Sequence, residues 1–107
     1  MKATRSHVVV LMTAPDAGTG AKLGTAAVEA RLAACANIVP GLRSIYRWKG
    51  KVNDDPEVLV IFKTRRALVP RLERLVGTLH PYEVFELIAL PIAAGHAPYL
   101  KWIDEST

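Results

Sequence analysis

Two short, continuously apolar runs rich in β-branched residues constrain the fold more than any other feature of this sequence. His7–Thr13 reads HVVVLMT and Val58–Phe62 reads VLVIF. Runs of this length and composition are typical of strands that are buried on both faces. We therefore predict that these two strands occupy the centre of a sheet, with the remaining elements packed around them.

Two segments carry the spacing of amphipathic helices. The first extends from about Thr19 to Cys35 and gives a narrow face of small and apolar residues: Leu23, Ala27, Ala30 and Ala34. The second has a leucine at every third or fourth position: Leu68, Leu72, Leu75 and Leu79. Pro70 is compatible with a helix only in its first turn, and Pro81 disfavours helical backbone at His80. The second helix is therefore predicted to end at His80.

Alternating residue types and turn-forming residues predict the other elements. Asn37–Ile45 is predicted to be a strand bent at Pro40-Gly41, and large aromatic residues alternate with charged ones as it continues to Lys49. Asn53–Pro56 (NDDP) is predicted to be a turn. Glu86–Pro91 completes the sheet, and Pro98–Glu105 closes the chain as a short helix.

The order of these elements is β-α-β-β-α-β, followed by a closing helix. This is the α+β, ferredoxin-like arrangement of a split βαβ unit. Right-handed crossovers place both helices on one face of an antiparallel sheet, with the four strands in the order 4-1-3-2. The chain has 107 residues, so we expect residues 1–107 to form a single domain.

The open face of this sheet predicts self-association. Both central strands are apolar on the face that no helix covers, and 50% of the residues are hydrophobic. Exposed apolar patches of that size usually mark an interface. The hairpin from Arg43 to Lys63 also presents a long edge that must be paired or protected. We expect a homo-oligomer that buries these sheet faces and pairs the hairpin edges.

Charge and cysteine content exclude several classes of protein. The formal net charge is +4, but the basic residues are scattered and interleaved with acidic ones, so we expect no nucleic-acid partner. Cys35 is the single cysteine, which rules out an intramolecular disulfide and fits the reducing cytoplasm. No segment has the length of a membrane span or the pattern of a signal peptide. We expect no membrane association.

The motifs that could carry chemistry are sparse. The glycines from Gly18 to Gly24 do not match the spacing of a dinucleotide or phosphate loop. No nucleophile elbow or Cys/His signature is present, and we expect no enzymatic activity and no required cofactor. His80 either caps a helix end or ligates a metal with Met12, Glu83 or Glu86 as neighbours, a soft donor set that would suit copper. Several aromatic residues are expected to fill core and interface: Tyr46, Trp48, Tyr82, Tyr99 and Trp102.

The sequence resembles the CutA divalent-cation tolerance family over nearly the whole chain from Val8 onward. The resemblance is carried by an ordered series of motifs: ARLAACANIVPG (30–41), SIYRWKGK (44–51), KT (63–64), HPYE (80–83), IALPI (88–92) and YLKWI (99–103). It implies a ferredoxin-like subunit in a tight homotrimer with strand pairing between subunits. It also implies a cytoplasmic protein linked to tolerance of divalent metals, especially copper.

The resemblance transfers the family's metal ligands only in part. Some members bind copper through a cysteine in the first strand and two adjacent histidines before Pro-Tyr, whereas this chain has Met12 and Leu79 at two of those positions. His80 alone matches. We therefore expect weak binding of copper or another divalent metal at His80, Met12 and Glu86. The family's common proline before Glu86 is replaced by Phe85, which predicts a less rigid entry to the last strand.

Two further functions are compatible with the sequence. The first is a signalling or adaptor trimer, similar in architecture to PII proteins, that binds a small anion or a partner protein in clefts between subunits. Its supporting feature is a basic hairpin: Arg43, Arg47, Lys49 and Lys51. We expect Tyr46, Arg47 and Trp48 to lie at the subunit interface. The second, a small phosphatase, would need a positioned arginine after the first strand, where Ala14-Pro15-Asp16 offers none.

Overall fold

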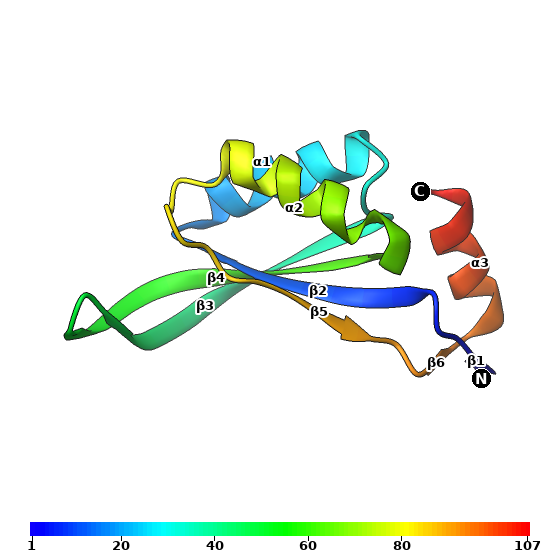
Figure 1. The fold of residues 1–107 in the computed structure, drawn as a ribbon, viewed down its shortest axis with the longest axis horizontal. Coiled ribbons are helices and arrows are strands. Elements are labelled where there is room, and N and C mark those ends of the chain that lie inside the picture. The colour runs from blue at the N-terminus through cyan, green and yellow to red at the C-terminus, as the bar shows by residue number, and fades with distance from the viewer.

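A four-stranded antiparallel sheet with two helices on one face forms the body of the molecule (Figure 1). The computed structural model describes residues 1–107. Its main elements are β2 (His7–Ala14), α1 (Ala17–Glu29), β3 (Cys35–Trp48), β4 (Lys51–Arg65), α2 (Val69–Leu79), β5 (Leu87–Pro91) and α3 (Ala97–Glu105). The sheet order is β3-β4-β2-β5, which is the predicted order 4-1-3-2. The fold is thus α+β, as expected.

Three short segments complete the chain. Arg66–Leu68 forms one 3₁₀ turn before α2, so that Pro70 lies in the first turn of that helix. β1 (Lys2–Ala3) pairs with β6 (Ala94–Gly95) in a separate two-stranded sheet. The sequence did not predict this pair. No helix of the chain is both long enough and apolar enough to cross a membrane.

The core lies between the sheet and helices α1 and α2. Alternate residues of the two central strands point into it, among them Val10, Met12, Val60 and Phe62, whose side chains are fully buried. The helices contribute Leu23 and Ala27 from α1 and Leu72 and Val76 from α2 to the same cluster. Every second residue of the strands and one face of each helix thus form a single apolar layer.

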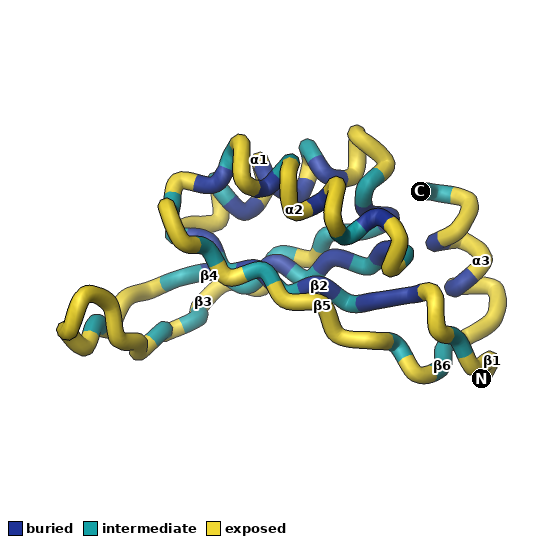
Figure 2. Tube along the Cα trace, viewed as in Figure 1, coloured by how far each residue is buried: buried dark blue, intermediate teal, exposed yellow.

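The other sheet face is apolar but only partly covered in one chain. Val9 and Leu11 of β2 are half-buried there, so this face of the strand is not fully covered within one chain. In the pairing register, Leu11 lies beside Ile61 of β4 and Ile88 of β5. Ile88 is 50% exposed and Leu90 is 46% exposed. The exposed stretch of β5 is visible below the helices in Figure 2.

Specific hydrogen bonds define both ends of helix α1. Asp16 caps its start, because the Asp16 carboxylate accepts a hydrogen bond of 2.7 Å from the backbone N–H of Thr19. The helix ends at Glu29 and not near Cys35, so the predicted extent was wrong. Arg31 adopts a left-handed φ of 58°, and the N–H of Leu32 bonds to the carbonyl of Ala27. This is the Schellman termination, which usually has glycine at the left-handed position.

The β3–β4 hairpin is long and extends well past the helices (Figure 1). It turns at Lys49-Gly50, where both residues have positive φ, and not at Asn53–Pro56 as predicted. Such a pair of left-handed residues matches the twist of a two-residue hairpin. The predicted bend at Pro40-Gly41 is confirmed, because the register shifts between Val39 and Leu42.

Candidate functional site

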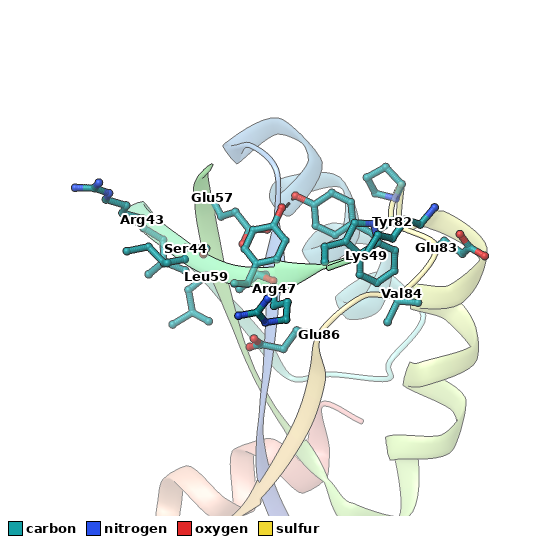
Figure 3. A pocket seen from close by; sticks show the side chains of 16 residues that line it. Arg43, Ser44, Arg47, Lys49, Glu57, Leu59, Tyr82, Glu83, Val84 and Glu86 are labelled. Atoms are coloured by element: carbon teal, nitrogen blue, oxygen red, sulfur yellow. Dashed lines mark hydrogen bonds between the residues drawn. The ribbon is translucent and has the colours of Figure 1, made fainter. Parts of the chain in front are cut away.

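A cleft lies where the β3–β4 hairpin faces the loop between α2 and β5. Its volume is about 980 Å³. The hairpin contributes residues 42–49 together with Glu57 and Leu59, and the loop contributes Pro81–Val84 and Glu86. Figure 3 shows side chains from both elements gathered at this cleft. Thr13, at the end of β2, lines it as well.

Two tyrosine–carboxylate pairs organise the polar groups of the cleft. The hydroxyl of Tyr82 donates to Oε2 of Glu57 at 2.9 Å, and this bond joins the loop to the hairpin (Figure 3). The hydroxyl of Tyr46 donates to Oδ2 of Asp55 at 2.7 Å. Burial, together with the bond to Glu57 and its charge, raises the pKa of Tyr82 far above its usual value. The bond to Asp55 raises the pKa of Tyr46.

Two basic residues at the cleft are already engaged within the chain. The guanidinium of Arg43 binds Asp54 through two nitrogens, and its Nε lies 2.8 Å from Oδ1. This contact lowers the pKa of Asp54. The ammonium of Lys49 lies over the ring of Trp48, 5.8 Å from the ring centroid, which is the geometry of a cation–π contact. No ion pair engages Arg47, the third basic residue that lines the cleft.

His80 is nearly buried and holds the loop in place. Its Nε2–H donates to the carbonyl of Thr13 at 2.8 Å, and its Nδ1 accepts from the N–H of Tyr82 at 3.1 Å. Because a carbonyl only accepts and an amide N–H only donates, these contacts define the neutral Nε2–H tautomer. The ring also lies against Tyr82 and Phe85, at centroid distances of 4.8 and 5.2 Å. Both ring nitrogens are therefore in use.

The three residues expected to bind metal do not form a ligand set in one chain. Met12 is fully buried in the core between sheet and helices. Glu86 is exposed and lines the cleft. No group of three or more His, Cys, Asp or Glu side chains is arranged to hold a metal ion. Because the lone pair of His80 is taken up by Tyr82, this donor set does not fit a tight copper site in a single chain.

The residues expected at a subunit interface all lie on the projecting hairpin. Tyr46 is 43% exposed, Trp48 is 42% exposed, and Arg47 is exposed beside them. All three line the cleft. Sequence reasoning missed Glu57, because the predicted strand began one residue later. Continuing its alternation by one position would have placed Glu57 on the same face as Leu59.

Comparison with known proteins gives consistent matches along the chain. Residues 8–106 match the family described as "CutA1 divalent ion tolerance protein". A divalent-cation tolerance protein CutA from Thermus thermophilus is 52% identical over 99 residues, which cover 92% of this chain and 96% of that protein. Protein CutA from mouse is 48% identical over 96 residues, 90% of this chain. The matched segment spans only 54% of the mouse protein, about half its length.

Solved structures agree in fold. A divalent cation tolerance protein from Thermus thermophilus superimposes with a TM-score of 0.92 at 50% identity, covering 94% of this chain and 98% of the other. CutA1 from Oryza sativa gives a TM-score of 0.93 at 45% identity, covering 97% of this chain and 95% of the other.

Proposed function

This chain belongs to the CutA1 divalent ion tolerance protein family, and from that membership we propose that it acts in tolerance of divalent cations, copper included, as a non-enzymatic homotrimer in the cytoplasm. The family match over residues 8–106 is the observation that carries the proposal. Cys35 is unpaired, which suits a reducing compartment. Fractionation of cells that produce the tagged full chain tests the compartment, and recovery outside the cytoplasm contradicts it.

The open sheet face supports the trimer. Ile88 and Leu90 are about half exposed on a surface that continues across Leu11 and Ile61, and burial of such a surface drives association. The hairpin edges would pair between copies, with Tyr46, Arg47 and Trp48 at their contacts. Sedimentation equilibrium should give about 35 kDa, three times the 11.7 kDa of one chain. A mass of one chain at micromolar concentration contradicts the trimer.

A charged substitution on the open sheet face tests whether copies of the chain meet there, and not at any other exposed apolar residue. Leu90→Glu should lower the assembled fraction, because it puts a carboxylate into the proposed interface. Val28→Glu is the matched control, since Val28 is 39% exposed on α1, on the other side of the molecule. Equal dissociation of both variants, or of neither, would show that the open face is not where copies meet.

We place weak metal binding at the cleft, with Glu86 as the accessible donor. His80 would join only by giving up the hydrogen bond from the Tyr82 N–H, and Met12 only by leaving the core. Calorimetry with Cu(II) and Cu(I) should give small heats that fall in Glu86→Gln and His80→Ala. Glu73→Gln, an exposed acid on α2, should leave them unchanged. Negligible and identical heats in all four proteins would remove the metal role.

The presence of a cleft of about 980 Å³ supports one second candidate, a signalling or adaptor role through a small ligand or partner. Of the basic residues once expected to attract an anion, Arg43 is paired with Asp54 and Lys49 covers Trp48. Fewer basic side chains are therefore free to bind an anion in the cleft than the sequence suggested. A thermal-shift screen against nucleotides and organic anions tests it, because ligands that bind the folded state raise Tm.

A further inference from the structure

We propose that the cleft between the β3–β4 hairpin and the loop before β5 binds a small organic ammonium compound against the aromatic rings of Trp48, Tyr46 and Tyr82. This goes beyond the proposed role in metal tolerance, since it concerns a different class of ligand. It needs no metal.

The aromatic composition of the cleft is the first argument. All three rings line one cavity of about 980 Å³, with Tyr46 and Trp48 from β3 and Tyr82 from the loop before β5. Aromatic ring faces carry partial negative charge and attract ammonium groups within about 6 Å of the ring centroid, most strongly for tryptophan and for alkylated ammonium. A cleft with several such rings has the chemistry of an organic-cation site.

The chain already places one ammonium group on this surface. Nζ of Lys49 lies 5.8 Å from the centroid of the Trp48 ring. Lys49 is exposed at the hairpin turn, so its side chain can swing into solvent without disturbing the core. The lysine ammonium thus shows that the Trp48 ring accepts a cation, and a ligand would take the position that Lys49 holds.

The charges around the rings favour a cation over an anion. Three carboxylates line the cleft: Glu57, Glu83 and Glu86. Among its basic residues, Arg43 is neutralised by Asp54, which leaves Arg47 and the movable Lys49. Both tyrosine hydroxyls donate to carboxylates, Tyr82 to Glu57 and Tyr46 to Asp55, and this directs negative charge toward the rings.

The cleft is held open by contacts that do not depend on a ligand. The Tyr82–Glu57 bond fixes one side to the other, and His80 fixes the loop to β2 through the carbonyl of Thr13. Pre-arranged rings of this kind lose little conformational entropy when a ligand binds. In the proposed trimer Tyr46 and Trp48 lie where the hairpins of two copies meet, so the cleft would be shared between those copies and binding is measured on the assembled protein.

Choline and its neutral isostere 3,3-dimethyl-1-butanol provide the direct test. The chain has two tryptophans, and Trp102→Phe leaves Trp48 as the only tryptophan reporter. With chelator present, choline should give a saturable change in Trp48 fluorescence, and the isostere should bind about tenfold more weakly. Equal affinity for the two compounds, or no saturable change with choline, overturns the proposal. Saturable binding of inorganic phosphate in place of choline also overturns it.

Two variants distinguish recognition of charge from folding defects. Glu57→Gln keeps an acceptor for the Tyr82 hydroxyl but removes the negative charge, and it should weaken choline binding several-fold without lowering Tm. Tyr99→Leu removes an aromatic ring of similar exposure on α3, away from the cleft, and should leave choline binding unchanged. Unchanged binding in Glu57→Gln, or weaker binding in Tyr99→Leu, contradicts the assigned site.

Discussion

Nε2 of His7 lies 2.8 Å from Oδ1 of Asp104, and this contact joins the first central strand to the last helix. The other ring nitrogen, Nδ1, forms a hydrogen bond of 2.6 Å with the hydroxyl of Thr4. Thr4 in turn accepts the N–H of Ser6. The two ends of the chain are therefore held to the sheet by one nearly buried imidazole.

Removal of Asp104 should destabilise the protein through His7. In Asp104→Ala the buried Nε2–H loses its partner, and we expect the free energy of unfolding to fall by about 1–3 kcal/mol. Glu105→Ala is the neighbouring control, because Glu105 takes part only in an exposed pair with Lys101, worth about 0–1 kcal/mol. Urea denaturation compares the two variants. Equal losses would show that the His7 contact adds nothing specific.

A glycine at the end of α1 should stabilise the chain. Arg31 holds a left-handed φ of 58° in the Schellman termination, a conformation that costs a non-glycine residue about 1 kcal/mol. Arg31→Gly should therefore raise the free energy of unfolding by up to about 1 kcal/mol. Arg31→Ala retains the strain and should not. If the two variants have the same thermal midpoint, backbone strain at this position is negligible.

Helix α1 packs on the sheet through glycines that have no room for a side chain. A Cβ on Gly24 would lie 3.0 Å from Cβ of Ala36, which is fixed to the β3 backbone. Gly24→Ala should lower stability, because overpacking costs about 1–3 kcal/mol and exceeds the gain of about 1 kcal/mol in helix propensity. Gly18→Ala, with 3.5 Å to Asp16, should be neutral or stabilising. A stabilised Gly24→Ala protein would contradict the close approach.

Stability should fall in alkaline solution because of Tyr82. Its pKa in the folded state is raised by burial and by the bond to Glu57, so the folded chain holds this proton more tightly than the unfolded chain. The contribution is complete below the usual tyrosine pKa of about 10 and is lost as pH rises above it. Urea midpoints measured across this range should decline less in Tyr82→Phe. The same decline in both proteins would assign the effect to other groups.

The fold could be predicted where burial determines the residue pattern. β2 and α2 each pack against the core, so their apolar patterns carry the information that places them. The end of α1 could not be predicted in this way. The segment after Glu29 is rich in alanine, which favours helix, but the left-handed Arg31 ends the helix without the glycine that usually signals it.

The hairpin turn was misplaced because most of the hairpin lies outside the core. Asn53–Asp55 and Pro56 have turn-like composition, yet they belong to β4. Pairing of β4 with β2 begins only at Val58, so at Pro56 the strand is paired with β3 alone and its other edge is open, which is where sheets tolerate proline. The left-handed pair at Lys49-Gly50 was the real signal. The role of His80 was equally hidden, because its partners Thr13 and Tyr82 meet only in the folded chain.

The hairpin separates the lining of the cleft from the core that keeps the chain folded. The β3–β4 hairpin, whose first strand carries Tyr46 and Trp48, extends past the helices and away from the apolar layer under α1 and α2 (Figure 1). Substitutions there change the shape and charge of the cleft without altering the core of the single chain. Mutations on the hairpin can therefore reshape the cleft during evolution while the core of each chain stays the same.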